Sequence, residues 1–361
     1  MTATEKIIVI ALPGIGDALM STPMFRLLRD ARPAAEIHAL VMFPATRDLL
    51  RADPNIDHVH FFDFIHTSKL EGLLYLFNLR KHGFDISINI FPQNRWQYNI
   101  FALLLGAGRK LGIRYKLRDW RNLSWLCTDT LGEDDSLHCV EENVRLLSLI
   151  GIGHPLVEKD LPPLEIHFKT EYREFAASWM KERGLTGSHP LIGFHAGTAL
   201  FKNHIMRRWA PEKFAALAKR LKAESGASVL LFGGPDDVSA NQIIKEIAGD
   251  AIIEVHTRSI MESIAIMEHM DVFVSNDSAL MHIAGGLGLK TVAIFGPTNE
   301  TYVHPWKTDY TIVHTGIECR PCFRYSTRPL VCFRHDPAEH FLCIRAIDVD
   351  QVFLATQDFL K

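Results

Sequence analysis

The sequence has no excess of charge of either sign and no long hydrophobic run. Its 361 residues include 39 Lys and Arg against 42 Asp and Glu, which gives a net charge of −3. This balance does not favour binding along a nucleic-acid backbone, so we expect no nucleic-acid partner. No apolar run approaches the roughly 18 residues of a membrane-spanning helix, and the N-terminus lacks the pattern of a signal peptide. We therefore expect a cytoplasmic protein.

Cysteine is also scarce, with six residues in the chain, four of them in one stretch. These four are Cys319, Cys322, Cys332 and Cys343. In a reducing compartment they are expected to be thiols or metal ligands rather than disulfides. A zinc site usually shows a second closely spaced pair, which this stretch lacks. We therefore favour thiols, and we predict no metal site and no cofactor.

Short β-branched segments alternate with longer amphipathic segments along the whole chain. The expected strands are residues 7–12, 36–41, 58–64 and 85–91 in the first half, and 190–196, 228–234, 251–256, 271–277 and 291–297 in the second. This alternation is typical of βαβ units and a parallel sheet. Gly and Pro concentrate in residues 151–166, which indicates a linker. The sequence therefore predicts an α/β protein with two Rossmann-like halves.

A glycine-containing turn, ALPGIGDAL, follows the first expected strand and places Gly14 and Gly16 before Asp17. Ligands of such sheets bind beyond the carboxyl ends of the strands, so this turn is a candidate site. The two glycines allow a tight turn with room for a ligand. Asp17 has two interpretations: it caps the following helix, or it acts on a substrate. A dinucleotide site would have a third glycine, and a carboxylate would repel a pyrophosphate, so we expect no nucleotide here.

The second half has better chemistry for binding a phosphate. In VSNDSALMHIAGGLG, Asp277 and Ser278 lie at a strand-to-helix junction, where backbone N–H groups can bind an anion. His282 is one helical turn further on and shares that face. The alternative is an ordinary helix cap followed by a core histidine. In FGGPDD, Asp236 or Asp237 could accept hydrogen bonds from ribose hydroxyls.

Cations follow the expected strand 190–196. Lys202, Arg207 and Arg208 come shortly before Trp209. Charges in a loop are usually just solvated. Their place after a strand, on the side where ligands bind, favours a clamp on a diphosphate.

Several segments resemble those of the heptosyltransferase family, glycosyltransferase family 9 of lipopolysaccharide core assembly. They include residues 7–33, RRWAPEKFAALAKRL, LLFGGPDD and FVSNDSALMHIAGGLGLKTVAIFGPTNE. The resemblance implies a GT-B fold, in which two Rossmann-like domains face a central cleft. Residues 1–160 would form the acceptor domain, 161–345 the nucleotide-sugar domain, and 346–361 a C-terminal helix crossing back to the first domain.

The resemblance also implies an activity and residue roles. The enzyme would transfer a sugar, heptose from ADP-heptose, onto a lipopolysaccharide core or related glycan acceptor, with inversion and without a metal. Asp17 would be the general base. On the donor side, Thr198 would lie in the donor loop, and Arg207 would stand where a lysine is usual. Asp237 would contact the ribose. The residues lining the diphosphate and sugar would be Asp277, Ser278, Ala279 and His282. The loop before Trp209 is longer than usual, which leaves Lys202 as an alternative to Arg207.

The sequence leaves three other functions open. A nicotinamide-dependent dehydrogenase would need its nucleotide at Gly14 and Gly16. A nucleotide-sugar epimerase of GT-B fold and a non-catalytic nucleotide-sugar-binding protein would both keep the second-half site, but the latter would not need Asp17.

A lipid-linked acceptor would require contact with the inner membrane leaflet. Residues 109–125 interleave Lys and Arg with Tyr115, Trp120 and Trp125. Cations can meet anionic headgroups while aromatic rings lie at the interface, so this segment is predicted to make peripheral membrane contact. The alternative is a solvated loop over the acceptor cleft.

Overall fold

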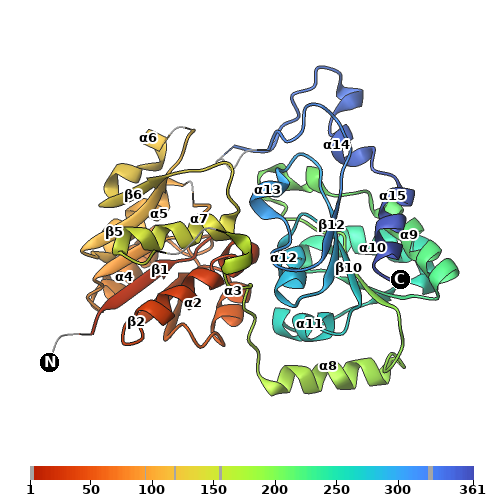
Figure 1. The fold of residues 1–361 in the computed structure, drawn as a ribbon, viewed down its shortest axis with the longest axis horizontal. Helices are drawn as coiled ribbons and strands as arrows, with labels where there is room; N and C mark the ends of the chain where they lie inside the picture. The colour runs from red at the N-terminus through yellow and green to blue at the C-terminus, as the bar shows by residue number, and fades with distance from the viewer. Residues whose placement is uncertain (1–3, 94, 118, 154–156, 324–327) are drawn as a thin grey trace. The chain divides into compact units, whose positions relative to one another are not determined.

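The structure is a computed structural model that describes residues 4–93, 95–117, 119–153, 157–323 and 328–361. These residues divide into two compact units, the first up to residue 167 and the second from residue 168 onward. In Figure 1 the elements of the first unit run from red to yellow and those of the second from green to blue. Each unit has its own sheet and core.

The described residues of the first unit form a parallel six-stranded sheet in the order β3-β2-β1-β4-β5-β6. Its strands are β1 (Lys6–Ile10), β2 (Glu36–Val41), β3 (His58–Phe61), β4 (Ile86–Asn89), β5 (Arg109–Arg114) and β6 (Asp129–Gly132). Its helices are α1 (Ile15–Leu19), α2 (Thr22–Ala31), α3 (Pro44–Leu50), α4 (Lys69–Arg80), α5 (Trp96–Leu105), α6 (Asp119–Asn122) and α7 (Cys139–Arg145). The central strand β1 is buried from Ile7 onward, as expected of a strand covered on both faces.

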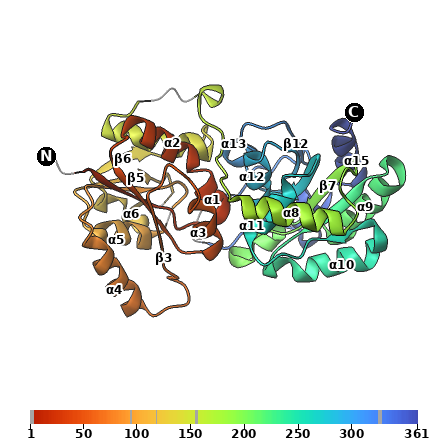
Figure 2. The ribbon, with the colours of Figure 1, turned by 90° about the horizontal axis from the view of Figure 1, so that it is seen from below.

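Helices cover both faces of this sheet. Ile8 and Ile10, two residues apart on β1, point to the same face and belong to one core cluster with Leu76 of α4 and Leu105 of α5. On the other side, α2 packs against α7. Figure 2 shows α2 and α4 on opposite sides of the sheet. The helices cover the faces of the sheet, so polar residues can lie at the carboxyl ends of the strands.

The described residues of the second unit form another parallel six-stranded sheet, in the order β12-β11-β10-β7-β8-β9. Its strands are β7 (Leu191–His195), β8 (Ser228–Phe232), β9 (Ile253–Glu254), β10 (Val272–Asn276), β11 (Lys290–Ile294) and β12 (Tyr310–Val313). Its helices are α8 (Thr170–Glu182), α9 (Pro211–Ser225), α10 (Val238–Ala248), α11 (Ile260–Met267), α12 (Ala279–Gly286), α13 (Glu300–Val303), α14 (Leu342–Arg345) and α15 (Val349–Asp358). Starting from β9, the order is that of the first sheet, so both units have the doubly wound topology.

The helices of the second unit also pack in pairs. Helix α9 contacts α10 and α15, and α8 contacts α11. The last helix, α15, lies beside α9 in both Figure 1 and Figure 2, and it also contacts β11 and β12. That residues 346–361 cross back to the first domain stays a prediction.

The predicted α/β class with two Rossmann-like halves is confirmed. All nine expected strands are present, and β5, β6 and β12 are additional to them. No helix within the described ranges is both long enough and apolar enough to span a bilayer.

Candidate active site

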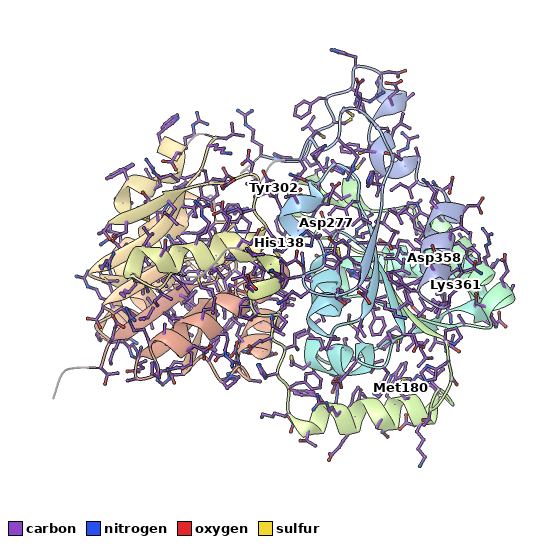
Figure 3. The ribbon with its side chains drawn as sticks, in the orientation of Figure 1. His138, Met180, Asp277, Tyr302, Asp358 and Lys361 are labelled. Carbon is purple, nitrogen blue, oxygen red and sulfur yellow. The ribbon has the colours of Figure 1, made fainter. Side chains whose placement is uncertain are left out.

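An arginine and an aspartate meet at the carboxyl edge of the second sheet. Strand β10 ends at Asn276, and Asp277 follows it. The Arg207 Nη1 donates to Asp277 Oδ2 at 2.6 Å, and both side chains are about nine-tenths buried. Figure 3 labels Asp277 just before α12. The two residues predicted to face the diphosphate are therefore side by side.

The start of α12 is open to an anion. Ser278 occupies the N-cap position, but its side chain makes no capping hydrogen bond. Its Oγ instead lies 2.8 Å from His195 Nδ1 and 3.0 Å from Ser275 Oγ. The alternative that Ser278 is an ordinary cap is therefore wrong. The first N–H groups of α12, beginning at the half-exposed Ala279, can donate to a bound anion.

A second ionic cluster surrounds Asp237, which is 6% exposed. Its Oδ1 accepts from Arg208 Nη2 at 2.9 Å, and its Oδ2 accepts from the Gly234 N–H at 2.9 Å and lies 3.3 Å from His195 Nε2. Burial acts to raise the Asp237 pKa, but the hydrogen bond and charge of His195 and the charge of Arg208 hold that pKa below its usual range. A Cβ on Gly197 would lie 2.0 Å from Asp237 Oδ1, so this close approach requires glycine.

His282 is buried beside the same edge. His282 is 5% exposed, and its Nδ1 has no hydrogen-bond partner in the described part of the chain. The pKa of His282 is lowered to about 4, mainly by burial and also by the charges of His304 and Arg207, while the charge of Asp277 opposes the shift. The ring is therefore neutral at neutral pH. An unsatisfied buried nitrogen is costly, which favours a ligand partner over a purely structural role.

Thr198 and Lys202 lie in the loop after β7. Thr198 is buried; its Oγ1 donates to the His204 carbonyl at 3.0 Å and accepts from Arg208 Nε at 3.2 Å. Lys202 adopts a left-handed backbone conformation (φ 54°), and its carbonyl accepts from the Leu330 N–H at 2.8 Å. Thr198 therefore positions Arg208, and the backbone of Lys202 is fixed by the segment around residue 330.

A pocket of about 230 Å³ lies beside these clusters, at the carboxyl ends of β8 and β9. It is lined by Leu231, Gly233, Gly234, Val238, Asn241, Gln242, Lys245, Glu246, Glu254, Val255 and His256. The exposed Asp236 and the buried Asp237 come directly after Gly234 and Pro235 in the chain. The second unit thus offers a concave surface next to its cationic cluster.

The predicted base lies at the carboxyl edge of the first sheet. Gly14 is the N-cap of α1, and Asp17 is in the first turn. Asp17 is half-buried, and its Oδ2 would lie 3.9 Å from a Cβ on Gly14. Burial raises the pKa of Tyr98; the charge of Arg95 lowers that pKa and the charge of Asp17 raises it. Asp17 therefore lies near the start of α5, where Arg95 is the N-cap.

Buried amides occupy the same edge and were not anticipated from the sequence. Asn89 Nδ2 donates to Asn99 Oδ1 at 2.8 Å, and Gln93 Nε2 donates to the Ile10 carbonyl. Asn89 Oδ1 and Gln93 Oε1 are buried and accept no hydrogen bond from the described residues. These carbonyl oxygens can accept from the hydroxyls of a sugar. No local sequence pattern distinguishes them, because they converge only in the folded sheet.

The structure of residues 109–125, the segment predicted to contact a membrane, agrees with that prediction only in part. Residues 109–114 form strand β5, and Tyr115 is 7% exposed, so an interfacial role for Tyr115 is wrong. Its ring stacks on Phe91 and its hydroxyl accepts from the Gln93 N–H. Trp120 and Trp125 are 69% and 71% exposed, as expected of interfacial rings. Position 118 lies outside the described residues.

The four C-terminal cysteines come together in a pocket of about 270 Å³. None of the six cysteines, all of which the structure describes, is in a disulfide. The pKa of Cys343 is raised to about 11, mainly by burial and also by the neighbouring Cys322, Cys319 and Cys332. Cys343 is therefore a protonated thiol at neutral pH.

Two Rossmann-like sheets, one with a cationic cluster and one with a carboxylate beyond its strands, suit an enzyme that transfers a group from a nucleotide-linked donor. The family model of glycosyltransferase family 9 (heptosyltransferase) matches residues 76–330. The chain belongs to this family of glycosyltransferases.

Relatives span almost the whole chain. Lipopolysaccharide heptosyltransferase 3 of Escherichia coli K12 is 25% identical over 358 residues, which is 96% of this chain and 95% of that protein. A glycosyltransferase family 9 structure from Veillonella parvula superimposes with a TM-score of 0.78 at 22% identity, covering 99% and 97% of the two chains. The E. coli ADP-heptose lipopolysaccharide heptosyltransferase II does so with a TM-score of 0.74 at 21% identity, covering 98% of each.

Proposed function

We propose that this chain transfers heptose from ADP-heptose to a lipopolysaccharide-core or related glycan acceptor. Its family membership and the names of its relatives support the substrate class. The single observation that carries the proposal is the Arg207–Asp277 pair beside the open start of α12. Such a site suits the diphosphate of a nucleotide sugar.

The donor diphosphate would be bound by charge and by the helix. Arg207 Nη1 is held by Asp277, while its Nε is buried and has no partner among the described residues. The start of α12 adds N–H donors and the positive end of the helix dipole. His282 Nδ1 supplies one further group for the diphosphate or the sugar. The nucleoside would lie in the pocket at β8 and β9.

Asp237 acts by positioning in this proposal. Both of its oxygens already bind His195, Arg208 and the Gly234 N–H. The ribose hydroxyls would meet the exposed Asp236, the alternative that the sequence left open. Arg208 is held by Thr198 and Asp237, so its charge adds to that of Arg207 at this edge.

Asp17 would be the general base. It would take the proton of the acceptor hydroxyl as that oxygen attacks the anomeric carbon and the bond to the ADP oxygen breaks. Attack opposite the leaving group inverts the anomeric centre. The charge gained by the diphosphate would be met by Arg207 and by the N–H groups of α12, so no step requires a metal ion. The buried amide oxygens of Asn89 and Gln93 would accept from acceptor hydroxyls.

An exposed apolar surface supports peripheral membrane contact. On α4, Leu70, Leu73, Leu74 and Phe77 are 66%, 37%, 59% and 44% exposed and follow helical spacing. Helix α5, which packs against α4, α6 and the turn Ser124–Leu126, adds the exposed Trp96 and Leu103. Lys69 is the first residue of α4 and Lys81 is its C-cap, so a cation lies at each end of the apolar stripe. We infer that this face meets an anionic leaflet.

Sedimentation with vesicles tests the membrane contact. The double variant Leu70→Ser/Leu74→Ser should bind anionic vesicles at least about tenfold more weakly, since burying a Leu contributes about 1.5–3 kcal/mol. Leu354→Ser on α15 is the matched control, at 58% exposure in the second unit. Equal sedimentation of the two variants, or of the native chain with anionic and neutral vesicles, would contradict this surface.

A panel of ADP- and UDP-sugars tests the proposed donor. ADP-heptose should raise the melting temperature most, and it should be consumed only when a lipopolysaccharide-core acceptor is present. Arg207→Gln should lose this shift. Arg173→Gln, which removes an exposed ion pair with Glu268 in the same unit, should keep it. A larger shift with UDP-sugars, or conversion of ADP-heptose without an acceptor, would overturn the proposal.

A further inference from the structure

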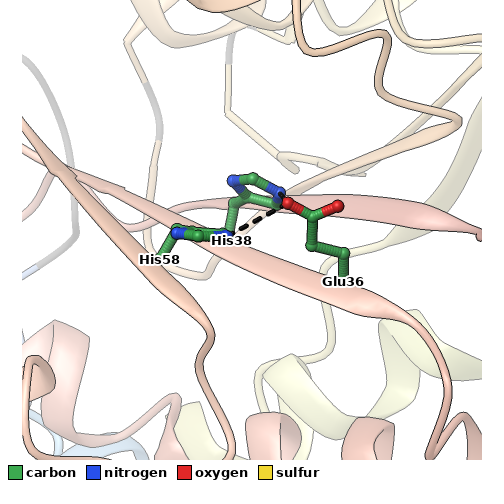
Figure 4. A group of neighbouring side chains, drawn as sticks. All are labelled: Glu36, His38 and His58. Carbon is green, nitrogen blue, oxygen red and sulfur yellow. Dashed lines mark ion pairs between the residues drawn. The ribbon is translucent and has the colours of Figure 1, made fainter.

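A group of histidines lies at the opposite end of the first sheet from Asp17. Strand β2 begins at Glu36 and β3 at His58, so this is the amino end of both strands. His38 is the register partner of His58, and Glu36 is two residues before His38. Residues two apart on a strand share a face, so the three side chains are brought together. Figure 4 shows them converging.

Their spacing is that of metal ligands. The Nε2 of His38 lies 3.2 Å from Glu36 Oε1, and the Nε2 of His58 lies 3.1 Å from the same oxygen. One ligand atom from each residue lies within 4.8 Å of the others. In a tetrahedral zinc site with bonds of about 2.0–2.1 Å, ligand atoms are about 3.3 Å apart. The two measured separations are close to this value.

The ring of His38 is oriented as a ligand would be. It is fully buried, and its Nε2 makes no hydrogen bond with any described residue although Glu36 is near. Its Nδ1 lies 2.8 Å from His60 Nε2. If His38 donates its Nδ1–H to His60, its Nε2 presents a lone pair toward a carboxylate, which is unfavourable without a cation between them. Metal-binding histidines commonly donate their second N–H in this way.

The surroundings leave the three ligand atoms available. The other oxygen of Glu36, Oε2, pairs with Lys6 Nζ at 3.3 Å, so Oε1 remains for a metal. The side chains of His58 and Glu36 are 52% and 27% exposed, which gives an ion a path from solvent.

We propose that Glu36, His38 and His58 bind a divalent transition-metal ion such as Zn²⁺, with water completing the coordination. Imidazole nitrogen with one carboxylate suits such ions. Strand β3 is at the edge of the sheet, so the ion would tie it to β2. The proposal does not depend on the proposed glycosyl transfer, because the cluster is at the amino end of the strands and the candidate active site is beyond the carboxyl ends.

Calorimetric titration of Zn²⁺ into chelator-treated protein tests this site. His58→Ala and Glu36→Gln should each weaken one zinc-binding event by at least about tenfold, which even loss of an outer-shell partner can cost. His66→Ala is the matched control, since His66 is an exposed histidine 2.8 Å from Asp63 in the same unit. Its zinc binding should equal that of the native chain. Equal binding by His58→Ala and His66→Ala would overturn the proposal.

Zinc could also bind elsewhere in the chain, so the ion must be located. Asp53, Glu165 and His167 form a second group with ligand atoms within 4.8 Å of one another, and the four C-terminal cysteines share a pocket. Anomalous scattering from a zinc-soaked crystal should give a peak between Glu36, His38 and His58. Peaks only at the second group or the cysteines, or loss of the binding event in His167→Ala instead of His58→Ala, would overturn the assignment.

Discussion

The two sheets have the same strand order but opposite chemistry at their carboxyl ends. Beyond the first sheet lie a carboxylate at a helix start, Asp17, and buried amides such as Asn89. Beyond the second lie two arginines, Arg207 and Arg208, each paired with a buried aspartate. The shared strand order of the two sheets therefore does not determine which ligand each sheet binds. In the proposed function, the charged groups placed after the strands make the difference: the first edge would accept a proton and the second would bind an anion.

The largest expected effect comes from removing the carboxylate of the first edge. Asp17→Asn should lower kcat by roughly 10²–10⁴-fold, the usual contribution of a positioned base, because an amide cannot take the acceptor proton. Folding should be preserved, because Asp17 is not the N-cap of α1 and Asn has nearly the same size and shape. Asp30→Asn, an exposed aspartate on α2, is the control and should turn over normally. A near-native kcat in folded Asp17→Asn would show that Asp17 is not the base, so the first edge would not have the role proposed for it.

The second effect comes from removing the cation of the second edge. Arg207→Gln should weaken ADP-heptose binding by roughly 10- to 100-fold, because hydrogen bonds to charged groups contribute about 1.5–3 kcal/mol. Arg207→Lys should recover most of this affinity. If Lys202→Ala weakens binding more than Arg207→Gln does, Lys202 is the phosphate contact instead. Melting temperatures separate these effects from unfolding, because Arg207→Gln leaves the Asp277 carboxylate without its partner.

The geometry of the second edge can be disturbed without changing any charge. Gly197→Ala would put a Cβ 2.0 Å from Asp237 Oδ1 and displace the carboxylate that holds Arg208. We expect a loss of stability of roughly 1–3 kcal/mol, as for other overpacked sites, together with weaker donor binding. Gly316→Ala has no atom within 4 Å of its new Cβ and should behave as the native chain. Denaturant unfolding of both variants checks this, and equal stability would contradict it.

The smallest expected effect is on pH dependence. Burial lowers the pKa of His282, and also of His204, to about 4, below the value of about 6.5 in the unfolded chain. The unfolded chain therefore binds more protons between about pH 4 and 6.5. Stability should be complete above about pH 6.5 and should fall as the pH drops toward 4. The fall should be shallower in His282→Gln, measured by urea unfolding, and an equal fall in both proteins would be inconsistent with a buried neutral ring.

The central strands β1 and β10 and the edge strands β3 and β9 could be predicted from sequence, whereas β5, β6 and β12 could not. The central strands, such as β1 and β10, are buried on both faces and read as continuous apolar runs. Strand β5 carries exposed cations at Arg109 and Arg114 around a buried centre, so its sequence looks like a basic loop. Strand β12 is short and half-exposed, which weakens its pattern.

Residues that come after a strand could be placed at the candidate site from sequence. Arg207 and Asp277 could be placed together because both come after strands of one parallel sheet. His195 was missed because a single histidine at a strand end has no distinguishing pattern, although it joins Ser278 to Asp237. The histidines around Glu36 were missed for a related reason: strand register brings them together.

Donor binding by Asp17→Asn and Arg207→Gln, measured side by side by calorimetry with ADP-heptose, tests the division between the two edges most directly. The account predicts a native Kd for Asp17→Asn, whose kcat is lost, and a Kd weakened by roughly tenfold or more for Arg207→Gln. Equal weakening of donor binding in both variants, or in Asp17→Asn alone, would contradict the assignment of the donor to the second unit and of the base to the first.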